Sequence, residues 1–200
     1  MKAIIFDTET TGRKNPVIIE GAWLELKSIL PYQTGESFCQ RYNPEKPIEL
    51  GALATHHIYD EELKDCPLHS EFSIPSSVEY IIGHNIDYDW NVAGNPNIKR
   101  ICTLALARRT WTDLDAYSQS ALFYFLERDK ARDVLKNAHS ASTDVEICSA
   151  ILKAICEKQN IDSLESLWQV SEKARIPVIM PFGKHKGLAI SEIPQDYKRW

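Results

Sequence analysis

The chain has 200 residues, of which 44% are hydrophobic, and a formal net charge of −5. This length suits one compact domain with a small appendage. No apolar run is long enough to span a bilayer or to form a signal peptide, so we expect no membrane partner and a cytoplasmic location. The acidic balance argues against binding nucleic acid through a bulk positive surface, because counterion release needs several cations at the phosphates.

Five cysteines are spread along the chain without a Cys-x-x-Cys pair or a plausible zinc spacing: Cys39, Cys66, Cys102, Cys148 and Cys156. An odd number at wide spacing is not typical of a disulfide framework. We therefore expect reduced, mostly buried thiols.

Taken in chain order, the apolar runs predict five strands, at residues 2–7, 17–26, 36–42, 80–82 and 101–102. Helical segments are expected at residues 51–57, 60–63, 87–93, 104–111 and 118–126, and a charged connection at 127–136. Strands followed by strands interleaved with helices predict an α/β domain with a mixed sheet.

A longer amphipathic helix is predicted from apolar residues that recur at helical spacing: Val145, Cys148, Ile151, Leu152 and Ile155. This helix is expected to pack on the sheet and to close a domain that spans residues 1–157. A helical pattern at 161–174 indicates a connector at 158–175. Residues 176–200 then form a small basic module.

Two carboxylates leave the first strand together, because strand alternation places Ile5, Asp7 and Glu9 on one side. Clustered carboxylates repel unless a cation lies between them, and oxygen ligands at a strand end suit Mg²⁺ or Mn²⁺. An isolated Asp-x-Glu pair is more often an ordinary pair of surface acids, so further acids are needed to support a metal site.

Asp144 is the second candidate, since it precedes Cys148 by four residues and Ile151 by seven on the buried face of the long helix. Its alternative role is to cap that helix. His139 lies just before the helix in a polar loop. An imidazole beside a metal-bound water is suited to take its proton near neutral pH.

The third acid lies in the segment His84-Asn85-Ile-Asp-Tyr-Asp89, where Asp89, Val92 and Ala93 share one helical face and Asp87 falls elsewhere. We therefore favour Asp89 over Asp87. The alternative is that both acids decorate a first helical turn, where the macrodipole stabilises negative charge.

Together, Asp7-Thr-Glu9, His84-Asn85-x-x-Tyr88-Asp89 and His139-x-x-x-x-Asp144 resemble, in order, the three motifs of the DnaQ-like, or DEDD, 3′-5′ exonucleases. The last spacing is similar to that of the DEDDh branch. The resemblance implies a ribonuclease H-like fold, in which helices flank a mixed five-stranded sheet. It also implies two divalent ions held by the four acids, with His139 as general base and DNA or RNA as substrate.

Further segments resemble bacterial exonuclease X proteins. These are Ile101-Cys-Thr-Leu104 with Ala107-Arg108-Arg109, and the tail Met180-Pro-Phe-Gly-Lys184-His-Lys186-Gly187. The tail is similar to a C-terminal module of that group, expected here as a small α/β appendage that continues past Trp200. Its glycines and lysines could bind a phosphate, or the glycines could serve a purely structural turn.

The resemblance also suggests substrate contacts at Thr8, Thr11, Gly12, His56, His84 and Asn85. Arg13 comes next, where relatives often carry an apolar residue, so we expect it to steer a phosphate or to contact a frayed duplex. A structural histidine is an equal alternative at His56. From residue 90 to 112 the chain carries four cations and no acid: Lys99, Arg100, Arg108 and Arg109. They form either a solvated helix face or a phosphate-facing patch.

We expect a 3′-5′ exodeoxyribonuclease that acts in DNA repair or end trimming. The alternatives are an RNA-trimming exonuclease, a proofreading subunit of a polymerase, and a non-catalytic binding scaffold. The scaffold is disfavoured because all four acids and the histidine are present. The sequence leaves the choice of DNA or RNA open, since a few pocket contacts read the 2′-hydroxyl, and it leaves the oligomeric state open as well.

Overall fold

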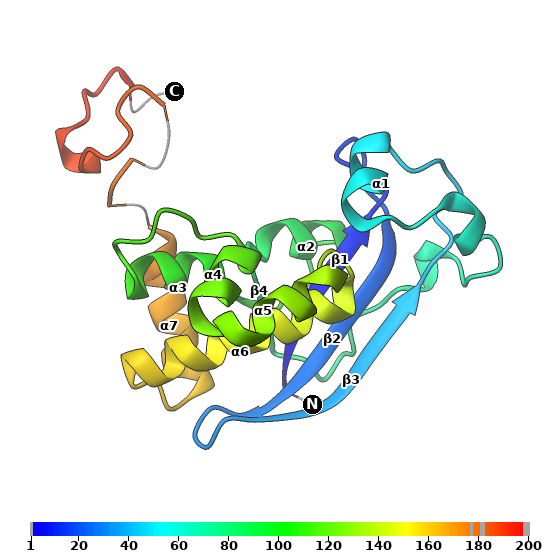
Figure 1. The fold of residues 1–200 in the computed structure, drawn as a ribbon, viewed down its shortest axis with the longest axis horizontal. Helices are drawn as coiled ribbons and strands as arrows, with labels where there is room; N and C mark the ends of the chain where they lie inside the picture. The colour runs from blue at the N-terminus through cyan, green and yellow to red at the C-terminus, as the bar shows by residue number, and fades with distance from the viewer. Residues whose placement is uncertain (1, 177, 181–182, 198–200) are drawn as a thin grey trace.

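The computed structural model describes residues 2–176, 178–180 and 183–197. Five strands form one sheet in the order β3-β2-β1-β4-β5 (Figure 1). The strands are β1 (Ala3–Thr10), β2 (Ile18–Ser28), β3 (Gln33–Arg41), β4 (Tyr80–Gly83) and β5 (Lys99–Cys102). β1 and β2, and β2 and β3, pair antiparallel, whereas β1 and β4, and β4 and β5, pair parallel. The predicted mixed five-stranded sheet is confirmed.

Seven α-helices lie in the described residues, and all except α5 lie in segments that were predicted to be helical. They are α1 (Leu50–His56), α2 (Asp87–Val92), α3 (Thr103–Thr110), α4 (Gln119–Leu126), α5 (Arg128–Val134), α6 (Ala141–Gln159) and α7 (Leu164–Arg175). Short 3₁₀ turns lie at Asp60–Leu63, His69–Glu71, Leu135–Asn137 and Ile190–Glu192. None of the described helices is long and apolar enough to cross a membrane.

The charged connection predicted at residues 127–136 is mostly a helix, because α5 occupies most of that range. Its charges mask a helical pattern. Ala131 is fully buried on one side of α5, and Lys130 pairs with Glu127 three residues before it. Such pairs at i,i+3 support a helix whose other face is solvated.

The sheet has an apolar layer on each face, and β1 contributes to both. Ala3 and Ile5 belong to the larger cluster, which includes the buried face of α6. Ile4 and Phe6 belong to the second cluster, on the opposite face. Because side chains alternate along a strand, the two acids that follow at positions 7 and 9 face the α6 side.

Helix α7 packs against α3 and β5, and its Leu167 is fully buried in the larger cluster. The chain then leaves the sheet, and the tail lies beyond α3 and α7 (Figure 1). In its described part, an isolated bridge joins Ile179 to Ala189 and a 3₁₀ turn follows. The predicted appendage also includes Pro177, Pro181, Phe182 and residues 198–200, which lie outside the described residues.

Candidate active site

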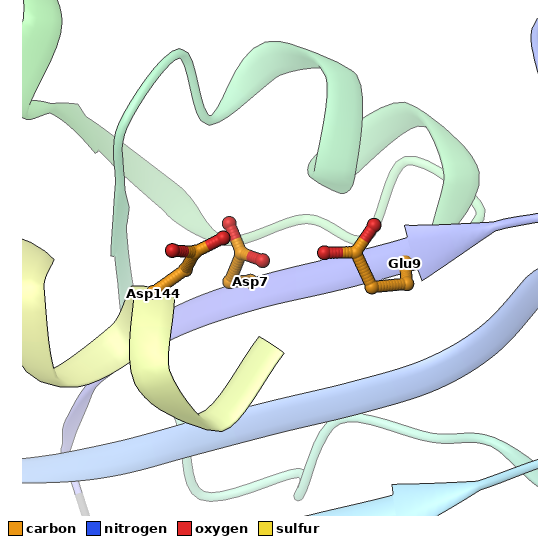
Figure 2. A group of neighbouring side chains, drawn as sticks. All are labelled: Asp7, Glu9 and Asp144. Atoms are coloured by element: carbon orange, nitrogen blue, oxygen red, sulfur yellow. The ribbon is translucent and has the colours of Figure 1, made fainter. Parts of the chain in front are cut away.

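Three carboxylates from two elements meet where β1 ends. Asp7 and Glu9 extend from β1, and Asp144 comes from the first turn of α6 (Figure 2). One oxygen of each lies within 4.8 Å of the others. Such a set of carboxylate oxygens fits a hard divalent cation. The pairing of β1 with β2 shifts register between Glu9 and Thr10. Such irregularities are common beside active sites.

Asp89 approaches the same strand from α2. It is buried, and its Oδ1 accepts hydrogen bonds from the Thr8 backbone N–H at 3.0 Å and from the Thr8 hydroxyl at 2.6 Å. Asp89 is not one of the three acids whose oxygens meet within 4.8 Å. It is nevertheless the acid whose charge raises the pKa of Asp7 most. Asp87 is exposed and pairs with Arg100 and Arg175, so it lies outside the site.

Negative charge is concentrated at this place. Burial, followed by the charges of neighbouring acids, raises the pKa of Asp7 well above its usual range and that of Glu9 to about 8. Burial also raises the pKa of Asp89 to about 7 and that of Asp144 to about 6. Without a cation, Asp7 and Glu9 therefore hold protons at neutral pH. They would lose these protons to solvent when a cation binds, because the cation stabilises the charged form.

His139 is exposed in the loop before α6, with a left-handed backbone at φ 67°. Its imidazole charge and its backbone N–H both lower the pKa of Asp144, against the larger effect of burial. The histidine therefore lies beside the acid cluster and remains open to solvent. This is a suitable position for a group that exchanges protons with water.

Sequence reasoning missed one buried acid, Glu20 on β2. Its Oε1 accepts from the N–H of Ala141, the first residue of α6, at 3.0 Å. Its Oε2 accepts from Arg41 Nε at 3.0 Å, and Arg41 also pairs with Glu62. The signal was present, because an ionisable residue within the apolar run 17–26 needs a buried partner. Glu20 thus supplies an acceptor for the end of α6 that carries Asp144.

A cavity of about 900 Å³ opens beside Glu9. Among the predicted substrate contacts, it is lined by Thr8, Gly12, Arg13, His56 and Asn85. Thr11 is turned into the fold instead, where its hydroxyl accepts from the Val17 N–H at 3.2 Å. We call this space the nucleotide cavity.

The loop at one wall of the nucleotide cavity is held from two sides. The Tyr88 hydroxyl donates to the Gly12 carbonyl at 3.1 Å and lies 2.6 Å from the Thr10 hydroxyl. The Glu49 carboxylate accepts the backbone N–H groups of Arg13 and Lys14, each at 3.1 Å. At Gly12, with φ 145°, an added Cβ would lie 2.3 Å from that carboxyl. The Tyr88 hydroxyl thus holds the Gly12 loop in place.

The two histidines predicted to contact substrate are held by internal contacts. His56 lines the nucleotide cavity, whereas His84 lines a second cavity instead. His84 Nε2 donates to the Tyr117 carbonyl at 2.9 Å, and Nδ1 lies 3.1 Å from the Thr103 hydroxyl. Burial lowers the pKa of His84 to about 4, so it is neutral near pH 7. His56 is also buried, and its Nδ1 accepts from the Ile58 N–H at 3.0 Å. Both histidines have structural roles in addition to any contact with substrate.

The four cations of segment 90–112 make different contacts. Lys99 pairs with Glu165 at 2.7 Å, Arg100 pairs with Asp87, and Arg109 donates to the Ile176 carbonyl at 2.9 Å. Arg108 lines a second cavity together with Lys186 of the tail, whereas Lys184 is exposed and does not line it. The segment is therefore neither a uniform solvated face nor a uniform patch.

Comparisons with known proteins agree with this geometry. No family model matches the chain. Exodeoxyribonuclease 10 of Escherichia coli K12 is 27% identical over 203 aligned positions, which cover 98% of this chain and 88% of the relative. The DNA polymerase III subunit epsilon of Pasteurella multocida is 30% identical over 174 positions, which cover 75% of this chain and 66% of the relative.

Among solved structures, exonuclease X in complex with 5′ overhanging duplex DNA matches with a TM-score of 0.67 and 25% identity, over 84% of this chain and 99% of that one. The E. coli exonuclease I complex with single-stranded DNA matches with a TM-score of 0.60 and 18% identity, over 80% of this chain and 41% of that one; this second likeness concerns the fold alone. The fold, the order of the three motifs and these relatives show that the chain belongs to the DnaQ-like exonuclease family.

Proposed function

We propose that this chain is a metal-dependent 3′-5′ exodeoxyribonuclease that releases 5′-mononucleotides from DNA ends. The observation that carries the proposal is the meeting of Asp7, Glu9 and Asp144 within 4.8 Å beside the nucleotide cavity. A buried cluster of acids is costly unless a cation neutralises it. The family relationship supplies the reaction class.

The donor set fits Mg²⁺ or Mn²⁺, because carboxylate oxygens are the ligands these hard cations prefer. We propose that two ions bind. Asp7 would be shared by both, Glu9 and Asp144 would complete one site, and Asp89 would support the other. Bound there, the ions would supply an activated water and charge neutralisation at the scissile phosphate.

The protein's own groups then have distinct roles. His139 would take the proton of the attacking water, since it is exposed beside Asp144. Asn85 and the backbone at Thr8 and Gly12 would hold the terminal nucleotide in the cavity that they line. Tyr88 would keep the Gly12 loop in place through its hydrogen bond. Arg13 lines the same cavity and would attract a phosphate.

We propose DNA as the substrate because the names of two similar proteins refer to DNA. One is an exodeoxyribonuclease, and another was solved with duplex DNA that has a 5′ overhang. We propose DNA repair or end trimming as the setting. We also propose a cytoplasmic location, supported by five free thiols, of which three are buried.

The test uses a 5′-labelled single-stranded DNA oligonucleotide with Mg²⁺ or Mn²⁺, analysed on a denaturing gel, with mononucleotides identified by chromatography. We expect a ladder that shortens from the 3′ end, and loss of activity in EDTA. Full activity in EDTA would overturn the metal mechanism. Matched RNA, duplex DNA and 5′-overhang DNA run in parallel, and faster RNA cleavage would overturn the choice of DNA.

Asp7→Asn serves as the inactive variant, because it removes the central carboxylate with little change of shape. The exposed acid Asp133, which pairs only with Lys136 among the described residues, provides the matched control Asp133→Asn. We expect wild-type rates from the control and no measurable ladder from Asp7→Asn. Equal rates from the two variants would contradict the assignment of the site.

A further inference from the structure

A second cavity, of about 880 Å³, lies between the body of the protein and the tail. Asn85, Arg108 and Tyr117 line it on the body, and Met180 and Lys186 line it on the tail. We call it the tail groove. Asn85 also lines the nucleotide cavity, so the two spaces adjoin at this residue.

The tail groove offers positive charge next to the nucleotide cavity. Arg108 and Lys186 are both exposed and line it from opposite sides. Within the described ranges neither forms an ion pair. The Arg108 guanidinium lies over the Tyr117 ring, 6.0 Å from its centre. Asp115 is the one acid among the lining residues. Unpaired cations on two walls of a groove suit a chain of phosphates.

The tail wall is organised by its backbone. Met180 N–H donates to the Leu188 carbonyl at 2.8 Å, and Gly187 N–H donates to the Met180 carbonyl at 2.9 Å. The turn between them needs Gly183, whose φ is 72° and whose added Cβ would lie 2.6 Å from the Tyr197 hydroxyl. These bonds place Lys186 at the groove.

Two neighbouring arginines of α3 act on this arrangement in different ways. Arg109 donates to the Ile176 carbonyl at 2.9 Å and so holds the start of the tail. Arg108, one residue earlier, lines the groove. Adjacent helical residues point about 100° apart. Helix α3 can therefore hold the tail through Arg109 and supply a cation to the tail groove through Arg108.

We propose that the tail groove binds the phosphate backbone of the nucleic-acid strand that leads into the active site, upstream of the terminal nucleotide, with Arg108 and Lys186 as phosphate contacts. This inference rests on the proposed function and extends it. The nucleotide cavity would hold the end to be cleaved, and the tail groove would hold the part that remains attached. The tail is then a substrate clamp.

The test compares a long and a minimal substrate on the full chain. The long substrate is a 5′-labelled single-stranded DNA of fifteen or more nucleotides, and the minimal one is the p-nitrophenyl ester of thymidine 5′-monophosphate, which has no upstream phosphates. We expect Arg108→Ala and Lys186→Ala each to raise KM for the oligonucleotide about tenfold, in line with the loss of a charge-assisted contact. We expect kcat/KM for the ester to stay unchanged.

Salt supplies a second readout. Each lost phosphate contact should make the negative slope of log K against log salt shallower by about 0.7 for a single strand. Arg108→Lys should restore most of the affinity. Lys184→Ala should have a smaller effect than Lys186→Ala, because Lys184 does not line the groove. Lys153→Ala is the matched control, since this exposed lysine of α6 lines neither cavity.

The outcomes separate the two proposals. If the wild type cleaves neither substrate, the proposed function fails. If it cleaves both, and the groove variants match the wild type on the oligonucleotide at every salt concentration, the groove inference is overturned. An equal loss on the ester would also overturn it, because the variants would then be acting through the active site. Selective loss on the long substrate supports it.

Discussion

In the absence of metal, Glu9→Gln should stabilise the protein at alkaline pH. Glu9 is partly buried, and burial together with the charges of Asp144, Glu20 and Asp89 raises its pKa to about 8. In the unfolded chain a glutamate titrates near 4.5. Between pH 4.5 and about 8, the folded state therefore keeps a proton that the unfolded state has lost. The free energy of unfolding is highest, with respect to this group, below pH 4.5, and the contribution is lost as pH rises through about 8.

The magnitude follows from that difference in pKa. At about 1.4 kcal/mol per pH unit, a rise from 4.5 to about 8 corresponds to an upper bound on the order of 5 kcal/mol. Neighbouring acids also take up protons when Glu9 ionises, which relieves part of the repulsion. We therefore expect Glu9→Gln to raise the free energy of unfolding by about 2 to 3 kcal/mol at pH 9.

The assay is urea unfolding in EDTA at pH 5 and pH 9. Glu36→Gln is the control, because Glu36 is exposed on β3, away from the cluster. The gain should be present at pH 9, nearly absent at pH 5, and absent in the control at both. Added Mg²⁺ or Mn²⁺ should stabilise the wild type more than the variant. Equal unfolding free energies for Glu9→Gln and the wild type at pH 9 would refute the electrostatic argument.

Two further predictions concern His139 in the loop before α6 and Glu20 on β2. His139→Ala should lower kcat by roughly 10²- to 10⁴-fold with little change in KM, as expected for loss of a general base, and unchanged single-turnover rates would remove it from that role. Glu20→Ala should lower the free energy of unfolding by about 1 to 3 kcal/mol, because the Ala141 N–H loses its buried acceptor. Glu20→Gln keeps an oxygen for that bond, so urea unfolding should show a smaller loss; equal losses would contradict this role.

The sheet and the long helix could be predicted from local patterns. Strand alternation alone placed Asp7 and Glu9 on one face, and helical spacing placed Asp144 near the buried face of α6. The same reasoning favoured Asp89, which is buried against Thr8, over Asp87, which is exposed. These residues lie on elements whose period is fixed by backbone geometry, so their direction is readable from the chain.

Contacts between distant segments could not be predicted in this way. Residues 127–136 looked like a connection because their charges hide a single buried position, Ala131. Glu20 looked like one acid in an apolar strand until its partners at Arg41 and Ala141 were known. The four cations of segment 90–112 looked alike, and only their neighbours separate them.

By itself, the sequence determined the family motifs, their order and the faces on which the acids lie. The tertiary structure alone decided that three of those acids meet within 4.8 Å, that Tyr88 holds the Gly12 loop, and that Arg108 and Lys186 line one groove. The physical reason is range. Periodicity acts over a few residues, whereas carboxylate repulsion and groove charge depend on the spatial distances between residues far apart in the chain.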